Sequence, residues 1–285
     1  MKYNIIKDIE FIKEYLSLSD TQLSKQLNKP RSTFNYWKHN EDSISNNSLS
    51  VVYEYAYKNN IFFNKIKGQI YKDLENDNKK ILFHGAKNKI VTNLDISYSK
   101  TNNDFGKGFY LGESLYQSAT FVAGYPNSNV YVCEYKVNPK LNVIKFDVTE
   151  EWMLAIAFYR NRIPNFANSK KILSIINKVD SADIIVAPIA DNNMYLIIEN
   201  FIDGIITDKQ CLSALGATNL GKQYVFKTNK ALKSLSILEQ CYLCESEKAD
   251  YLIEKKANDE IGSQKTKMAQ REFAGIGKYI EELLK

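Results

Sequence analysis

Hydrophobic residues in the first sixty positions recur at the spacing of helices. Five of them lie on one face and predict an amphipathic helix: Ile5, Ile6, Ile9, Ile12 and Leu16. A short second helix is expected after an N-cap at Ser19 or Asp20, and the Asn28-Lys29-Pro30 run ends it. A third helix covers residues 31–38, and Ser48 is the candidate N-cap of a fourth. The chain is therefore expected to begin with a small all-helical domain.

From about residue 80 onward, short apolar strands alternate with helices. Asn129–Val137 alternates with period two and is the clearest strand. Further strands are expected at Ile81–His84, Gly108–Gly112, Leu141–Phe146, Ala182–Pro188 and Gln223–Thr228. Helices are expected over residues 114–122, 150–161, 194–202 and 209–215. This order predicts an α+β fold with a split mixed sheet. It excludes a doubly wound dinucleotide fold, which needs a Gly-x-Gly-x-x-Gly directly after its first strand.

The segment from Lys230 to Lys285 is almost wholly helix-compatible. Its apolar stripe consists of Leu232, Leu235, Leu238, Tyr242 and Leu243. We expect a helical lid or brace on the core, with a partner-binding tail as the alternative. The predicted organisation is an N-terminal helical domain (residues 1–62), a polar connector (63–79), an α+β domain (80–240) and a helical C-terminal extension (241–285).

Composition adds a few constraints. The net charge is +5, from 38 basic and 33 acidic residues, which is too small an excess to indicate a nucleic-acid coat. No stretch approaches the roughly 20 apolar residues of a membrane span, and the N-terminus lacks the apolar core of a signal peptide. We therefore expect a cytoplasmic protein without a membrane partner.

Cys241 and Cys244 form a Cys-x-x-Cys pair without a second pair or a nearby histidine. We expect no metal there, and two thiols on one face of a helix.

Two segments about twenty residues apart carry the candidate chemistry. His84, one of only two histidines, follows the apolar run Ile81–Phe83 and precedes Gly85. A histidine there places an imidazole at the end of a strand, and the glycine lets a ligand approach its backbone. The second segment, residues 105–111, reads Phe-Gly-Lys-Gly-Phe-Tyr-Leu and puts aromatic residues directly after two glycines.

These segments resemble the diphtheria-toxin-like and poly(ADP-ribose)-polymerase-like ADP-ribosyltransferases, and within them the group filed as DUF3990. The resemblance covers about residues 78–240. It implies that NAD is the co-substrate, that His84 holds the adenosine ribose and that the Gly85 backbone holds the nicotinamide amide. It also implies that Gly108 lines the pocket and that Tyr110 stacks on nicotinamide.

Three later positions extend the resemblance. Ser118 and Phe121 fall at the spacings of a serine that bonds the carboxamide and a second aromatic that closes the sandwich. Residues 222–228 resemble the family's last motif strand, with Gln223 at the position where a glutamate is usual. The resemblance thus implies a catalytic triad of His84, Tyr110 and Gln223. A glutamine can hold a ribose hydroxyl but cannot act as a carboxylate base, which favours transfer of single ADP-ribose units over polymer formation.

The N-terminal helices resemble the helix-turn-helix of phage repressors, whose second helix enters the DNA major groove. The positions that match this role are Arg31, Ser32, Thr33, Asn35, Tyr36 and Lys38. They include a bidentate donor for guanine, an amide for adenine, and hydroxyls and a lysine for phosphate. The alternative is a helical bundle that only docks on the catalytic domain or on a partner.

The function expected from the resemblance is mono-ADP-ribosyl transfer from NAD to a macromolecular acceptor, protein or nucleic acid. Such an enzyme would serve as a bacterial toxin or an anti-phage effector, with the helix-turn-helix binding DNA or regulating its own operon. Two alternatives stay open. One is an NAD glycohydrolase of the same fold, in which water accepts the ADP-ribose. The other is a non-enzymatic regulator that senses NAD and binds DNA.

Overall fold

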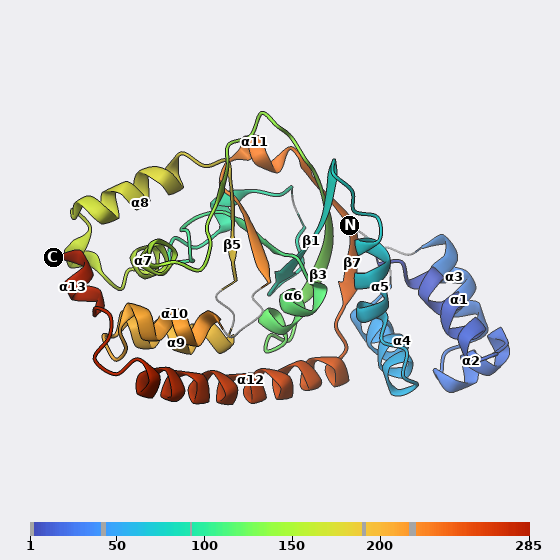
Figure 1. Cartoon of the computed structure of the whole chain (residues 1–285). Coiled ribbons are helices and arrows are strands. Elements are labelled where there is room, and N and C mark those ends of the chain that lie inside the picture. Colours follow the sequence, from blue (N-terminus) through green and yellow to red (C-terminus); the bar gives the residue numbers. More distant parts are fainter. Residues whose placement is uncertain (1–2, 41–43, 92, 190–191, 217–220) are drawn as a thin grey trace. The chain divides into compact units, whose positions relative to one another are not determined.

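The structure is a computed structural model that describes residues 3–40, 44–91, 93–189, 192–216 and 221–285 (Figure 1). The chain divides into two compact units. The first contains Met1–Val91, Ser114–Tyr135 and Ser236–Leu252, and the second contains Thr92–Glu113, Lys136–Leu235 and Ile253–Lys285. Each unit therefore combines segments that are distant in the sequence.

The first unit begins with helices, as the spacing of its apolar residues predicts. They are α1 (Ile5–Tyr15), α2 (Asp20–Gln26), α3 (Arg31–His39), α4 (Asn46–Lys58) and α5 (Phe63–Lys72). One apolar core contains the inner face of α1 together with Phe34 and Trp37 of α3. Ser19 is the N-cap of α2 and forms a reciprocal capping box with Gln22.

The predicted start of α4 is wrong by one turn. Ser45 is the N-cap, and its hydroxyl accepts a hydrogen bond from the Ser48 backbone N–H at 3.3 Å. Ser48 is instead buried in the first turn of the helix. Both serines stand before the same apolar run, so composition alone did not separate them.

The first unit also contains three strands among its described residues, in the order β1-β3-β7. They are β1 (Lys79–Ala86), β3 (Asn129–Lys136) and β7 (Leu235–Tyr242). Helix α6 (Leu115–Val122) lies against β1. Ile81, Phe83, Leu115, Val122 and Val130 share one buried cluster, which fixes the end of β1 against α6.

The C-terminal segment differs from the all-helical prediction. Leu235–Tyr242 forms strand β7, and α12 (Glu245–Glu272) begins only after it. Cys241 is buried within β7 and Cys244 lies beyond its end, so the expected placement of both thiols on one helix face is wrong. The leucines of this segment match helical spacing over too short a stretch to exclude a strand, and burial beside β3 decides the conformation.

A buried charge cluster connects α1, α5 and β7. Lys67 Nζ lies 2.5 Å from Asp8 Oδ2 and 2.7 Å from Glu239 Oε1. Tyr53 donates a hydrogen bond to Asp8, and Tyr71 donates one to Glu239. All three charged side chains are at least nine-tenths buried. A buried lysine or carboxylate without its partner is costly, so these elements must stay together.

The second unit contains a mixed sheet with the order β4-β5-β6-β2. Its strands are β2 (Phe109–Gly112), β4 (Val143–Lys145), β5 (Ile184–Pro188) and β6 (Lys222–Phe226). β4 and β5 are parallel, whereas β6 is antiparallel to both β5 and β2. Gly112 pairs with Gln223, and Tyr110 pairs with Val225. Because opposed residues and alternate residues share a face, Tyr110 and Gln223 lie on the same face of this sheet.

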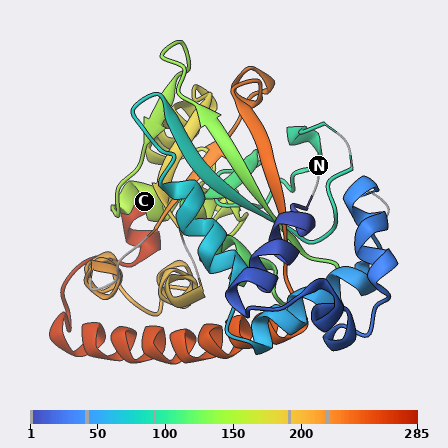
Figure 2. The ribbon, with the colours of Figure 1, turned by 90° about the vertical axis from the view of Figure 1, so that its right-hand side faces the viewer.

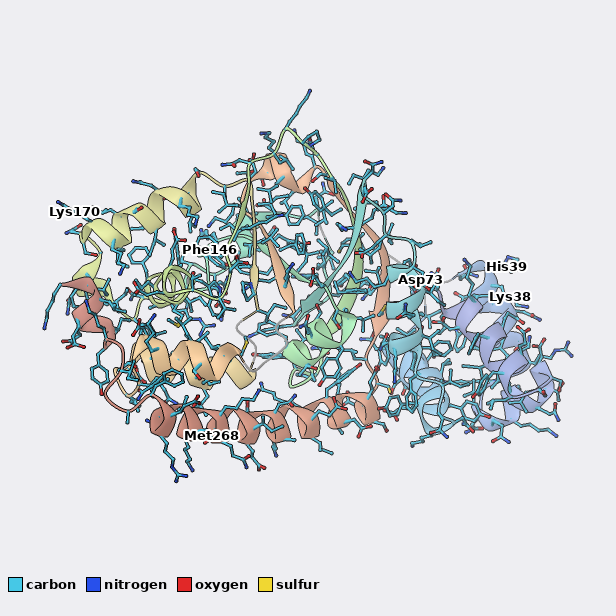
Figure 3. All side chains as sticks on the ribbon, in the orientation of Figure 1. Lys38, His39, Asp73, Phe146, Lys170 and Met268 are labelled. Carbon is cyan, nitrogen blue, oxygen red and sulfur yellow. The ribbon has the colours of Figure 1, made fainter. Side chains whose placement is uncertain are left out.

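Helices supply the core of the second unit. The helices that contribute to it are α7 (Glu150–Tyr159), α8 (Lys170–Asp180), α9 (Asn192–Ile202), α10 (Asp208–Gly216), the part of α12 after Leu252 and α13 (Ile280–Leu284), and α11 (Asn229–Leu232) follows β6. Two short 3-10 segments are η2 (Ile96–Tyr98) and η3 (Pro164–Phe166). α9 and α10 run side by side in both views (Figures 1 and 2). Trp152 of α7 is fully buried in the core, and Phe146, next to β4, is buried there as well (Figure 3).

The observed architecture confirms the predicted α+β class. Helices form the N-terminal part, strands and helices alternate after β1, the sheet of the second unit is mixed, and helices end the chain. Within the described ranges, none of the helices is both long enough and apolar enough to cross a membrane.

Glu247, in the first turns of α12, is a buried carboxyl in the first unit. It accepts hydrogen bonds from Asn64 Nδ2 at 2.7 Å and from the Tyr251 hydroxyl at 2.9 Å. Burial raises the pKa of Glu247 to about 7, although both hydrogen bonds oppose the shift.

We expect Glu247 to make the protein less stable as the pH rises from 4.5 to about 7. Over this range the folded state holds a proton that the unfolded chain releases, so deprotonation favours unfolding. Glu247→Gln removes this contribution, and its Tm relative to the wild type should rise from about pH 5 to about pH 8. Thermal unfolding followed by circular dichroism measures the difference. The exposed Glu254→Gln is the control and should match the wild-type profile. A pH-independent difference for Glu247→Gln would contradict the prediction.

Candidate functional site

The predicted site residues are distributed over both units. His84, Gly85, Ser118 and Phe121 belong to the first unit. Gly108, Tyr110 and Gln223 belong to the second.

In the first unit, the end of β1 is pressed against α6. A Cβ atom on Gly85 would lie 2.3 Å from the Ser118 carbonyl oxygen and 3.1 Å from Val122 Cγ1. The Ser118 hydroxyl donates to the Phe83 carbonyl at 2.9 Å. Ser118 therefore contacts the chain on both sides of His84, and its hydroxyl proton is already engaged. Toward a ligand it would act as an acceptor.

His84 is half-buried at this strand end. Its ring centroid lies 6.4 Å from that of Tyr131, with an interplanar angle of 36°. The Tyr131 hydroxyl accepts a hydrogen bond from the Ile90 backbone N–H at 2.8 Å. Phe121, the second expected aromatic, is 67% exposed on α6. A phenyl ring this exposed is available to a flat ligand but is not held by its surroundings.

In the second unit, Tyr110 fixes the loop that precedes its own strand. Its hydroxyl donates to the Gly106 carbonyl at 2.7 Å and accepts from the Phe105 backbone N–H at 3.1 Å. Burial raises the pKa of Tyr110 well above its usual range, so the phenol stays protonated. Gly108 packs against β6, where an added Cβ would lie 2.6 Å from Val225 Cγ1. The glycine block thus brings the loop close to the strand that carries Gln223.

Gln223 is buried, and its amide orientation follows from its neighbours. Its Nε2 donates to Asp104 Oδ2 at 3.0 Å and to the Pro188 carbonyl at 3.1 Å. Both partners are acceptors, so the nitrogen must face them and the amide oxygen must point away. The oxygen is then the group with which Gln223 can accept a hydrogen bond from a ligand.

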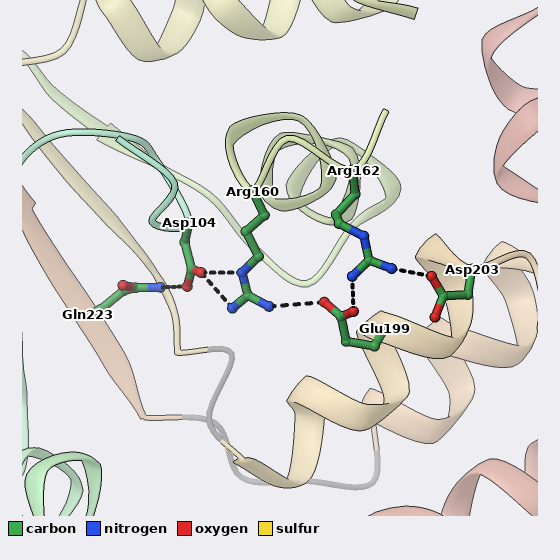
Figure 4. Close-up of polar contacts among 6 residues, drawn as sticks. All are labelled: Asp104, Arg160, Arg162, Glu199, Asp203 and Gln223. Carbon is green, nitrogen blue, oxygen red and sulfur yellow. Dashed lines mark hydrogen bonds and ion pairs between the residues drawn. The ribbon is translucent and has the colours of Figure 1, made fainter. Parts of the chain in front are cut away.

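Asp104 begins a chain of polar contacts that we call the Asp104 cluster: Asp104, Arg160, Arg162, Glu199, Asp203 and Gln223 (Figure 4). Arg160, at the end of α7, donates to Asp104 Oδ1 through Nε at 2.9 Å and Nη2 at 2.6 Å. Its Nη1 lies 3.6 Å from Glu199 Oε1 on α9. Arg162 pairs with both Glu199 and Asp203. Three carboxylates face two guanidinium groups, so the cluster carries one net negative charge.

Asp104 and Arg160 are not among the site residues predicted from the sequence. Asp104 stands two residues before Gly106 and could have been noted as the polar residue that opens the glycine block. Arg160 gave no comparable signal, because it is separated from Asp104 by 56 residues and ends an otherwise apolar helix.

A protein-family model matches residues 80–237, which is more than half of the chain. The family is described as protein of unknown function (DUF3990). The chain belongs to this family. Searches of curated proteins and of solved structures found no match. The DUF3990 segment begins in β1 and ends in β7, so it includes every residue of the predicted triad and of the Asp104 cluster.

Gly85→Ala should destabilise the protein strongly. The Ser118 carbonyl is backbone, so relieving a 2.3 Å contact requires α6 to move. We expect Tm to fall by on the order of 5 °C or more, measured by thermal unfolding. Gly124→Ala is the matched control, since its Cβ would meet only Leu252 Cδ2 at 4.0 Å. Equal Tm values for the two variants would contradict the close approach of β1 to α6.

Proposed function

We propose that the protein is a mono-ADP-ribosyltransferase that uses NAD and transfers ADP-ribose to a macromolecular acceptor. The observation that carries this proposal is the fixed amide of Gln223. Its nitrogen is committed to Asp104 and Pro188, which leaves the oxygen as an acceptor for a ribose hydroxyl. Tyr110 lies on the same sheet face and supplies an aromatic ring beside it.

The reaction requires cleavage of the bond between nicotinamide and ribose. The bonding electron pair leaves with nicotinamide, positive charge develops on the ribose, and the acceptor's nucleophile then bonds to the same carbon. Tyr110 would stack on the departing ring, and Gln223 would orient the ribose through a hydroxyl. His84 keeps the role that the family resemblance implies, binding the adenosine ribose.

A test starts from the purified full chain and NAD. The wild type should release nicotinamide and, with cell lysate, transfer label from NAD labelled in its adenylate part to a macromolecule. Tyr110→Phe keeps the ring and should retain NAD binding in calorimetry. Tyr110→Ala and His84→Ala should lose at least about 100-fold in nicotinamide release, a loss typical of removing a group that binds the transition state.

The control is Tyr98→Ala, which removes a tyrosine ring that is 77% exposed in the same unit as Tyr110. It should release nicotinamide at the wild-type rate. Nicotinamide release without a labelled acceptor would identify a glycohydrolase instead. NAD binding without nicotinamide release would identify an NAD sensor. A chain that does not bind NAD would overturn the transferase, the glycohydrolase and the sensor alike.

We further propose that α2 and α3 bind duplex DNA. Support comes from the exposure pattern of α3, in which Phe34 and Trp37 are buried while Arg31, Asn35 and Lys38 are exposed. Ser32 and Tyr36 are also exposed, and Thr33 is half-buried. Lys38 and His39 extend outward from the end of α3 (Figure 3). A polar and basic face opposite an anchored aromatic face suits a groove-binding helix.

Arg31→Ala combined with Lys38→Ala should weaken duplex binding and make it less dependent on salt. Each lost phosphate contact lowers the slope of log K against log salt by about 1. Fluorescence anisotropy with a labelled duplex at several salt concentrations measures both effects. Lys267→Ala combined with Arg271→Ala makes the same charge change on exposed positions of α12 and should bind like the wild type. Absent or salt-independent binding by the wild type would contradict the proposal.

A further inference from the structure

The side chain at position 223 lies between two acceptors. Asp104 Oδ2 and the Pro188 carbonyl oxygen both accept from its amide nitrogen, at 3.0 and 3.1 Å. A glutamate has the same length but no donor when ionised. It would place a carboxylate oxygen where the nitrogen now lies, facing a carboxylate and a carbonyl without a proton between them.

Asp104 is itself held in place from three directions. Two nitrogens of Arg160 bind Oδ1, which leaves Oδ2 for Gln223 (Figure 4). The next two residues are held by the Tyr110 hydroxyl, which bonds the Phe105 N–H and the Gly106 carbonyl. Lys227, on the chain just after β6, donates to the Phe105 carbonyl. The carboxylate is therefore bound directly by Arg160, and the two residues that follow it are held by Tyr110 and Lys227.

We propose that Asp104 is the positioning residue of this site, and that its carboxylate sets the amide orientation of Gln223 and requires glutamine rather than glutamate at position 223. Its effect on turnover rests on the proposed transferase function, whereas its effect on the side chain at 223 does not. Without Asp104, the amide of Gln223 keeps only the Pro188 carbonyl as a fixed partner. The amide group is then less restrained, and its oxygen is no longer held toward a ribose hydroxyl.

A thermodynamic cycle tests the structural part without any NAD. The four proteins are the wild type, Asp104→Asn, Gln223→Glu and the double variant. Gln223→Glu should lower Tm by on the order of 5 °C at about pH 8, because it buries two carboxylates in contact. Adding Asp104→Asn should raise Tm again, since an asparagine can donate its amide to the new glutamate while its oxygen still accepts from Arg160.

The matched control adds Asp147→Asn, at an exposed carboxylate of the same unit, to Gln223→Glu. This change removes the same charge without touching position 223, and it should recover no stability. The proposal is overturned if Gln223→Glu is as stable as the wild type. It is equally overturned if Asp147→Asn rescues it as well as Asp104→Asn does, or if the effects of Asp104→Asn and Gln223→Glu simply add.

Kinetics test the functional part. Asp104→Asn should lower kcat for nicotinamide release at least about 10-fold while changing KM for NAD less than about 3-fold, because orientation matters most in the transition state. A rise in KM at unchanged kcat would assign Asp104 to ground-state binding and overturn the positioning role in turnover. If the wild type releases no nicotinamide, the transferase proposal fails, and the Tm cycle still decides whether Asp104 sets the side chain at 223.

Discussion

The contact between the Asp104 carboxylate and the Arg160 guanidinium is the interaction on which the second unit's motif segments depend. Arg160 occupies one carboxylate oxygen and leaves the other to the amide of Gln223. Both charged side chains are about 15% exposed, so each needs its partner. The glycine block, strand β6 and the end of α7 are joined at one carboxyl group. Tyr110 adds a second connection through the peptides that follow Asp104.

Elements whose burial follows from their own residues could be predicted from the sequence. Phe34 and Trp37 point inward as their spacing indicates, and Ser19, one of the two expected N-cap residues, caps α2. β7 could not be predicted in the same way. Its leucines fit a helix, and its strand conformation comes from β3, about a hundred residues earlier in the chain. Local propensity is a weak guide where a distant strand decides the outcome.

The candidate site also combines features that follow from local sequence with features that depend on distant contacts. Gln223 and Tyr110 lie on adjacent antiparallel strands, so their shared face follows from the register once β2 and β6 pair. The residues that orient them do not follow from any local pattern. Asp104 lies 119 residues from Gln223 and 56 from Arg160, and the ion pair forms only when α7 packs beside the loop. The motifs thus point to Tyr110 and Gln223 as candidates, but they carry no signal for the residues that hold these side chains in place.

The buried charge cluster of Lys67, Asp8 and Glu239 limits how the chain can change by recombination and substitution. The DUF3990 match ends at residue 237, inside β7, whereas Glu239 lies two residues further on and pairs with Lys67 of α5. Exchange of the family segment alone would divide β7 but keep Lys67 and Glu239 from the same parent, whereas a single crossover at residue 237 would combine them from different parents. A descendant that lost Lys67 would bury Asp8 and Glu239 without a cation, and one that lost Glu239 would leave Lys67 with Asp8 as its remaining partner in the cluster. Substitutions in the N-terminal helices and at the end of β7 are thus coupled through these charges, although the family match covers neither.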